Sequence, residues 1–241
     1  MPPKTEQEEI KVARINKSAL TKLEIIRVAS RLFLSEGYSN TSIKMVCKEL
    51  DMSPGNVTFY FPSKEHLLAE LTDLLCKFQW KWMEQEADEG ISSVLAICME
   101  MAAMVTMCED PVAKDFLLST YTSPLCLEIV RRNDVKRAKE VFAQYRPKWT
   151  HEQFVEAEAL ISGVEYGTLM TVGEPVSLEK RLSGALHNIL GVYGIAPEIR
   201  EAKIAKVFAM DYRNLGKTVL SEFKKYVEEA NEQAFMELLG R

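Results

Sequence analysis

Apolar residues recur every three to four positions along almost the whole chain, and no segment alternates apolar and polar residues as a half-buried strand would. The pattern therefore predicts an all-α fold. A first helix is expected over residues 18–36, where Gly37 follows as a stop signal. The apolar stripe of this helix consists of Leu23, Ile26, Ala29, Leu32 and Phe33.

Two short helices follow, and a tight turn separates them. Thr41 or Ser42 is expected to cap the first of the two. Its inner face consists of Ile43, Val46, Cys47 and Leu50. In the turn, Asp51 tolerates a left-handed conformation, Ser53 offers an N-cap oxygen and Pro54 suits the first position of a helix. Two helices joined in this way are typical of a helix-turn-helix unit.

The second of these short helices, over residues 54–61, has an unusual outer face. When Val57 and Phe61 point into the core, the outward or boundary positions are Gly55, Asn56, Thr58, Phe59 and Tyr60. In a major groove, Asn56 can hydrogen-bond both N6 and N7 of an adenine, and Phe59 can lie against a thymine methyl group. This face therefore suits DNA.

Charge is distributed unevenly, and this supports the same interpretation. The 241 residues carry a net charge of −5. Residues 11–64 carry nine Lys or Arg against four acidic residues, a net charge of +5, so the rest of the chain carries about −10. A basic end on an acidic body favours a polyanionic partner for that end. On charge alone, the alternative is that these basic residues form a solvated helix face without such a partner.

The segment "IIRVASRLFLSEGYSNTSIKMVCKELDMSPGNVTFYFPSKEHLL" resembles the DNA-binding domain of the tetracycline-repressor (TetR) family of bacterial transcriptional regulators. The resemblance covers about residues 20–75. Its marks are Ala29, Phe33, Gly37, Tyr38, Thr41, Ser42, Ile43, Phe61, Ser63, Lys64 and Glu65. The resemblance implies a dimer that binds a palindromic double-stranded DNA operator and responds to a small-molecule effector.

The resemblance also implies which residues contact DNA. Carried over position by position, these are Lys44, Gly55, Asn56, Thr58, Phe59, Tyr60 and Lys64, and the candidate set further includes Thr41, Ser42 and Lys48. Two positions depart from the family pattern: Asp51 replaces the usual turn glycine, and Thr58 stands where tyrosine is usual. Because threonine is shorter, Tyr60 is expected to take the phosphate contact instead.

A fourth helix is expected from Ser63 to about Glu89, and Gly and Pro divide the rest of the chain into further helices. These are expected over 91–109, 111–122, 124–146, 150–173, 177–194 and 197–238, the last with a break near Asn214-Leu215-Gly216. The predicted domains are a flexible arm (1–17), a DNA-binding domain (18–64) and an effector-binding and dimerisation domain (65–241).

Two late segments, "EALISGVEYGTLMTVG" and "LSGALHNILGVYGI", have wide apolar faces. In TetR-like proteins two late helices from each subunit form a four-helix dimer interface, which makes these segments its candidates. The candidate interface residues are Leu169, Leu186 and Leu190. A face sandwiched inside one subunit is the alternative. Glu165 and His187 are the polar exceptions, and a structural role is favoured for each over a pocket role.

The segment "ICMEMAAMVTMCED" is rich in methionine, a flexible residue that can line an adaptable pocket. The predicted effector-pocket residues are Met101, Met104, Met107, Tyr121 and Tyr166, with Glu100 as a polar anchor. The predicted effector is mostly apolar. A methionine-rich core without a ligand is the alternative.

Other functions lack support in the sequence. No H-E-x-x-H, E-x-x-H, G-x-S-x-G or glycine-rich phosphate loop occurs, so no enzyme, metal or cofactor is predicted. The five cysteines include no C-x-x-C pair, which favours free thiols and a cytoplasmic protein. No signal peptide or membrane span is predicted. The predicted function is a ligand-responsive dimeric repressor; the alternative is a helical adaptor that binds only protein.

Overall fold

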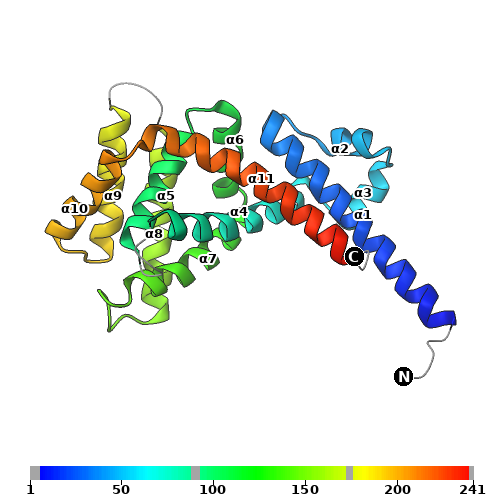
Figure 1. Ribbon diagram of the computed structural model, residues 1–241, viewed down its shortest axis with the longest axis horizontal. Coiled ribbons are helices and arrows are strands. Elements are labelled where there is room, and N and C mark those ends of the chain that lie inside the picture. Colours follow the sequence, from blue (N-terminus) through cyan, green and yellow to red (C-terminus); the bar gives the residue numbers. More distant parts are fainter. Residues whose placement is uncertain (1–5, 88–92, 172–175, 239–241) are drawn as a thin grey trace.

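The computed structural model describes residues 6–87, 93–171 and 176–238, and these ranges contain helices and no strand (Figure 1). The predicted all-α fold is confirmed. The helices are α1 (Glu6–Glu36), α2 (Ile43–Leu50), α3 (Pro54–Tyr60), α4 (Lys64–Ala87), α5 (Val94–Met107), α6 (Pro111–Thr122), α7 (Pro124–Phe142), α8 (His151–Met170), α9 (Leu178–Val192), α10 (Pro197–Ala209) and α11 (Tyr212–Leu238). Within the described ranges, no helix has both the length and the apolar character needed to cross a bilayer.

Two predicted boundaries are wrong. Helix α1 begins at Glu6 rather than Ser18, so the predicted arm is helical from residue 6 onward. No glycine or proline interrupts this stretch, and nothing in the sequence ends the helix before Glu36. The break between the last two helices lies at Met210-Asp211 rather than near Gly216. Residues 1–5 and the predicted breakers Gly90 and Pro175 lie outside the described residues.

Gly216 has a packing role instead of a helix-breaking one. It lies inside α11, where its N–H donates to the Thr106 hydroxyl at 3.0 Å, and a Cβ at this position would overlap the backbone of Met107. A glycine therefore lets α11 approach α5 closely. The break occurs where Asp211 precedes α11 and its carbonyl oxygen accepts the N–H of Asn214 at 3.1 Å.

Helix α5 is the central helix of the body. All of its residues except Ile97 are buried, and it packs mainly against α11, α4 and α10. Its methionines therefore fill the core. The alternative interpretation of the methionine-rich segment, as core, describes most of this helix.

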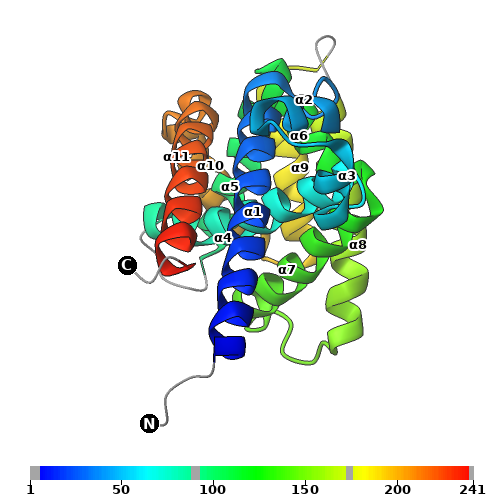
Figure 2. The same ribbon diagram turned by 90° about the vertical axis from the view of Figure 1, so that its right-hand side faces the viewer.

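Helices α2 and α3 lie at one end of the molecule. Helix α1 runs between α11 on one side and the α2–α3 pair on the other, as both views show (Figure 2). The small core under α2 and α3 consists of Ile25, Ala29, Phe33, Val46, Val57 and Phe61. This arrangement leaves the outer face of α3 uncovered by the body.

Candidate DNA-binding face and ligand cavity

The turn between α2 and α3 has the predicted local structure. Asp51 adopts φ 50° and ψ 43°, and it is the one non-glycine residue with positive φ among the residues that the structure describes. The Met52 N–H donates to the Cys47 carbonyl at 2.9 Å. Ser53 caps α3 by accepting the Asn56 N–H at 3.3 Å, and Pro54 occupies the first helical turn. The aspartate thus replaces the usual glycine without changing the turn.

Helix α3 presents the outer face that its sequence predicts. Val57 and Phe61 are buried beneath it. Gly55, Asn56, Thr58 and Phe59 are exposed, and Tyr60 is half-buried. Phe59 is 79% exposed and is the most exposed of the large apolar side chains that the structure describes. Solvent exposure of a whole phenyl ring forgoes its burial energy, so this position favours a partner surface.

Thr58 and Tyr60 have hydrogen bonds within the protein. The Thr58 hydroxyl donates to the Pro54 carbonyl at 2.9 Å, inside α3. The Tyr60 hydroxyl accepts from the Ser18 hydroxyl at 3.4 Å, and its ring meets Phe59 edge to face at 5.2 Å between centroids. Tyr60 therefore supports the Phe59 ring from the side of α1.

Two lysines project from α2 beside this face. Lys44 and Lys48 are four residues apart, both are exposed, and neither forms an ion pair with any residue that the structure describes. Positions i and i+4 share one face of a helix. Their ammonium groups are thus available to an anionic partner.

Thr41 does not belong to the contact surface, and its prediction as a DNA contact is wrong for the side chain. Thr41 is only 2% exposed, and its hydroxyl donates to the Gly37 carbonyl at 2.7 Å. It closes the end of α1. The neighbouring Ser42 is exposed and caps α2 by accepting the Met45 N–H at 3.4 Å.

Lys64 has a structural role that sequence reasoning missed. Its ammonium donates to the Tyr38 carbonyl at 2.7 Å and to the Thr41 carbonyl at 2.9 Å, and it lies 3.9 Å from the centroid of the Tyr38 ring. Burial lowers the pKa of Lys64. The lysine fastens the start of α4 to the loop between α1 and α2 (residues 37–42). Its contact with DNA stays a prediction.

A carboxylate from α6 holds the same loop. Asp115 accepts the Ser39 N–H at 2.7 Å and also accepts the Ser39 hydroxyl. Gly37 has φ +91°, and a Cβ there would lie 2.8 Å from Asp115. Seventy-six residues separate Ser39 from Asp115, so no local sequence signal reveals this contact. It joins the DNA-binding end to the body.

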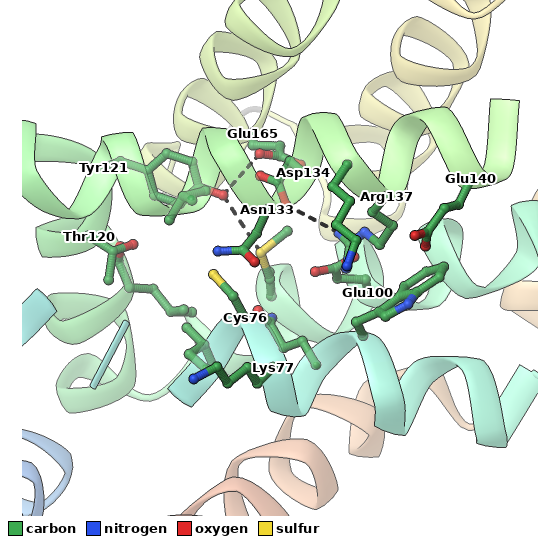
Figure 3. Close-up of a pocket in the computed structure, with 17 residues that line it drawn as sticks. Cys76, Lys77, Glu100, Thr120, Tyr121, Asn133, Asp134, Arg137, Glu140 and Glu165 are labelled. Atoms are coloured by element: carbon green, nitrogen blue, oxygen red, sulfur yellow. Dashed lines mark hydrogen bonds and ion pairs between the residues drawn. The ribbon is translucent and has the colours of Figure 1, made fainter. Parts of the chain in front are cut away.

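The body contains a cavity of about 300 Å³ between α4, α5, α6, α7 and α8 (Figure 3). This volume is at the lower end of the range for small-molecule sites. The residues that line it are Leu75, Cys76, Lys77, Gln79, Trp80, Glu100, Met104, Leu117, Thr120, Tyr121, Val130, Asn133, Asp134, Lys136, Arg137, Glu140 and Glu165.

The structure separates the predicted pocket residues. Met104 and Tyr121 line the cavity, and Met101 lines a smaller space of about 20 Å³ next to it. Tyr166 does not line it but lies 6.3 Å from Tyr121, ring to ring. Met107 does not line this cavity; it lies where α5 meets α11.

Seven of the 17 residues that line the cavity are charged, and one is a methionine. Arg137 pairs with Glu100 and lies 3.6 Å from Asp134. Glu165 accepts the Tyr121 hydroxyl at 3.0 Å. Figure 3 shows these side chains converging from α5, α6, α7 and α8. The lining therefore combines apolar and charged side chains, and sequence reasoning missed Asp134 and Arg137 on an otherwise charged helix.

Burial raises the pKa values of carboxyl groups in this wall. Desolvation, together with neighbouring carboxyl groups, raises the pKa of Glu165 well above its ordinary value. Desolvation also raises the pKa of Asp134, although the Arg137 guanidinium opposes the shift. Glu158, which accepts the Tyr193 hydroxyl behind the cavity, has a raised pKa for the same first reason.

The predicted interface leucines are core residues. Leu169, Leu186 and Leu190 are buried within this single chain, so their assignment to a dimer interface is wrong. The wide apolar faces of α8 and α9 are sandwiched inside the subunit, as the alternative interpretation held. His187 lies at the surface with Nε2 3.6 Å from Glu201, and Glu165 lines the cavity.

A different face of α8 remains open. Val155, Leu160 and Met170 are exposed there, and Leu160 is 66% exposed. Cβ atoms added at Gly163 and Gly167 would meet no atom within 4 Å, so packing inside the subunit does not require these glycines. The open face of α8 is thus apolar, and its two glycines leave the helix backbone accessible.

Comparison with known proteins gives matches at the amino-terminal end. Residues 25–71 match the family described as bacterial regulatory proteins, tetR family. The chain is 45% identical over 47 residues to YuxN, an uncharacterized HTH-type transcriptional regulator of Bacillus subtilis strain 168. It is 34% identical over 68 residues to the HTH-type transcriptional regulator QacR of Staphylococcus aureus strain Mu50. These alignments cover 20% and 28% of this chain and only 16% and 35% of the two relatives.

Two solved structures show a weaker likeness over a longer stretch. Salmonella enterica GusR matches with a TM-score of 0.42 and 23% identity, over 72% of this chain and 94% of its own. A gamma-butyrolactone receptor described as an ArpA-like protein matches with a TM-score of 0.39 and 17% identity, over 86% of this chain and 98% of its own.

The matched segment coincides with the helices whose outward residues resemble a DNA-reading surface. It begins at Ile25 in α1, includes α2 and α3, and ends at Leu71 in α4. The matched family and both curated relatives are described as regulators. Residues 25–71 thus match the tetR family of bacterial regulatory proteins, and the alignments span well under two thirds of the length of the curated relatives.

Proposed function

We propose that this protein is a dimeric transcriptional repressor that binds a palindromic operator through α2 and α3 and releases it when a small molecule enters the cavity. The observation that carries the proposal is the outer face of α3, where a 79% exposed Phe59 lies beside exposed Gly55 and Asn56. An adaptor that binds only protein has no need of this face within a matched DNA-binding segment.

Each part of the face has a distinct role on DNA. Gly55 lets the start of α3 come close to the groove, Asn56 reads a base edge, and Phe59 lies against a thymine methyl group. Lys44 and Lys48 contact phosphates, which fixes orientation without selecting sequence. Residues 18–64 thus act as the DNA-binding domain, and residues 65–241 bind the effector and form the dimer.

The open face of α8 is the proposed dimer interface. Val155, Leu160 and Met170 supply its apolar area, and Gly163 and Gly167 allow a second copy of α8 to approach closely. A two-fold axis through this face sets the distance between the two copies of α3. Successive major grooves on one side of DNA are about 34–36 Å apart, which is the spacing the repressing state must match.

Helix α6 couples the cavity to the DNA-binding end. Tyr121, near its carboxyl end, lines the cavity, and Asp115, one and a half turns earlier, holds Ser39 in the loop that leads into α2. A ligand that displaces Tyr121 therefore also moves the support of α2. To weaken operator binding about 100-fold, the ligand must favour the released state by about 2.7 kcal/mol.

The direct test is selection of DNA from a random pool, followed by fluorescence anisotropy on the selected site. The expected result is a palindromic site bound at least about 1,000-fold more tightly than random DNA. Binding without any sequence preference, or no binding to DNA at all, would contradict the proposal and favour the adaptor.

A further inference from the structure

The wall of the cavity has more negative than positive charge at its buried end. Four carboxyl groups from three helices, called here the acidic group, are those of Glu100, Asp134 and Glu165, which line the cavity, and of Glu158, which lies behind it. Arg137, which is partly buried, is the one basic side chain among them in the part of the chain that the structure describes. It pairs with Glu100 and lies 3.6 Å from Asp134, so one positive charge faces four carboxyl groups.

The lysines near the cavity do not balance this excess. Lys77 is 60% exposed and pairs with Asp73 at 2.6 Å, outside the acidic group. Lys136 is exposed at the mouth, where Glu140 is also exposed. Water screens charges at such positions far more than charges inside. The charge inside the cavity is therefore negative whenever its carboxyl groups ionise.

Arg137 shows how this wall holds a cation. Its guanidinium lies 5.1 Å from the centroid of the Trp80 ring while it pairs with Glu100 and approaches Asp134. An aromatic face with carboxylates at its edge is the arrangement that binds flat organic cations. Tyr121 and Glu165 repeat this combination, with their hydrogen bond of 3.0 Å, on the opposite side of the cavity.

A second observation marks the cavity as a binding site. Gln79 lines it and is only 5% exposed, yet its Nε2 has no hydrogen-bond partner among the described residues. A buried amide without a partner is destabilising by about 1–3 kcal/mol. A protein retains such a group where a ligand satisfies it, and an amide can offer either its NH₂ or its oxygen by turning over.

We infer that the effector is a small organic cation with a flat or aromatic body, held in the cavity by Glu165 and Asp134 against the rings of Tyr121 and Trp80. The inference rests on the proposed ligand-responsive function, and it replaces the apolar effector expected from the methionines. A metal ion is a poorer fit, because the described residues contain no cluster of His, Cys, Asp or Glu arranged to hold one.

The inference accounts for the raised pKa values of carboxyl groups in the wall. Without a ligand, the raised pKa values of Glu165 and Asp134 favour their protonated forms. A bound cation stabilises the carboxylates, so it lowers these pKa values and releases protons. The other ionisable groups facing the site are Cys76, Lys77, Glu100, Tyr121, Lys136, Arg137, Glu140, Glu158 and Tyr193. Affinity for a permanent cation therefore increases as the pH rises through the raised carboxyl pKa values.

The test compares three probes of nearly identical size and shape: benzamidinium, neutral benzamide and anionic benzoate. Each is titrated into the full chain by calorimetry, with phenyltrimethylammonium as a second cation. We expect benzamidinium to bind at least about tenfold more tightly than benzamide, a difference of about 1.4 kcal/mol, and benzoate to bind most weakly. Titrations in two buffers with different ionisation enthalpies should show proton release with the two cations and not with benzamide or benzoate.

Substitutions test which carboxyl groups of the cavity bind the cation. Glu165→Gln and Asp134→Asn should each weaken benzamidinium binding about tenfold and leave benzamide binding unchanged within about twofold. Glu128→Gln is the matched control, because Glu128 is exposed on α7, the same helix as Asp134. Equal loss of benzamide binding in the cavity variants would overturn the assignment. If a variant fails to fold, the series of three probes on the unmutated protein still decides the matter.

Two outcomes on the unmutated protein would overturn the inference. One is binding of benzamide or benzoate as tightly as benzamidinium. The other is no binding of either cation at about 10 mM, a concentration at which a fitting ligand of this size binds measurably. Operator binding, measured in parallel, separates this failure from that of the proposed function. A protein that binds its operator but no cation refutes the inference alone, and a cation that binds without changing operator affinity refutes only its effector role.

Discussion

The DNA-binding end and the cavity differ in how their residues come together. The turn before α3 and the outer face of α3 are built from one continuous segment, in which Asp51, Ser53 and Pro54 act within a few residues of one another. The cavity is built from five helices, and its central ion pair joins Glu100 of α5 to Arg137 of α7. Local chemistry determines the first, whereas the packing of distant helices determines the second.

This difference predicts how each region responds to change. A substitution on α3 should alter recognition and leave the fold intact, because the side chains concerned touch little of the protein. A substitution in the body should alter stability, assembly or ligand response through neighbours on other helices. The following variants test that contrast, from the largest expected effect to the smallest.

The largest effects are expected from two substitutions, one in the core face of α9 and one on the open face of α8. Leu186→Ala should lower the free energy of unfolding by about 2–5 kcal/mol, because Leu186 is fully buried in the subunit. Leu160→Lys should change the stability of the subunit by less than about 0.5 kcal/mol but convert the proposed dimer to a monomer. Denaturant unfolding and light scattering measure the two effects. Dissociation by Leu186→Ala without loss of stability would return that leucine to the interface.

The second effect concerns the link between the two regions. Asp115→Ala removes a charged acceptor of two hydrogen bonds from Ser39 and should cost about 1.5–3 kcal/mol of stability. Because α6 then no longer holds the loop before α2, the effector should release the operator less effectively. Anisotropy with and without effector measures the coupling. Glu109→Ala, in the turn before α6, is a control outside this contact, and an unchanged response in Asp115→Ala would exclude α6 as the link.

The third comparison concerns Lys44 and Lys64, which the sequence predicts as DNA contacts and for which the structure suggests different roles. Lys44→Ala should weaken binding to all DNA sequences and reduce the slope of log affinity against log salt by about one, because a phosphate contact releases about one counterion. Lys64→Ala should instead lower the melting temperature, since Lys64 holds the carbonyls of Tyr38 and Thr41. An unchanged salt slope in Lys44→Ala would remove Lys44 from the phosphate contacts.

The smallest effect is the pH dependence of stability. Glu165 has a folded-state pKa raised above its unfolded value, so the folded protein binds more protons than the unfolded chain above about pH 4.3. Its contribution to stability is present below that pH and is lost as the pH rises through the raised pKa. Glu165→Gln should therefore flatten the decline in melting temperature over this range. A decline of the same slope in the variant would show that Glu165 is not its source.

The success of sequence reasoning follows the same division. The left-handed Asp51, the Ser53 cap and the outward Phe59 were predictable because each depends on neighbours in the same segment. The α1 helix was predicted too short because a charged, mixed-sign segment was interpreted as an arm. Gly216 was interpreted as a break, although it serves a close contact with α5 that only the packed structure reveals.

The errors in the body have one physical cause. A methionine-rich or leucine-rich face shows that a helix is buried but not which neighbour covers it. Leu186 and Leu190 are therefore covered by the same chain, and Met107 lies where α5 meets α11. The charged pair that lines the cavity, Asp134 and Arg137, lies in a segment with many charges, and its sequence does not distinguish the inward ones.

The claim that α3 reads the operator can be tested by one measurement, the affinity of Asn56→Ala for the selected operator and for random DNA. Because Asn56 is exposed and its side chain is proposed to contact a base edge, the variant should lose about 1–3 kcal/mol on the operator and almost nothing on random DNA. Equal losses on both DNAs, or none on either, would contradict the account.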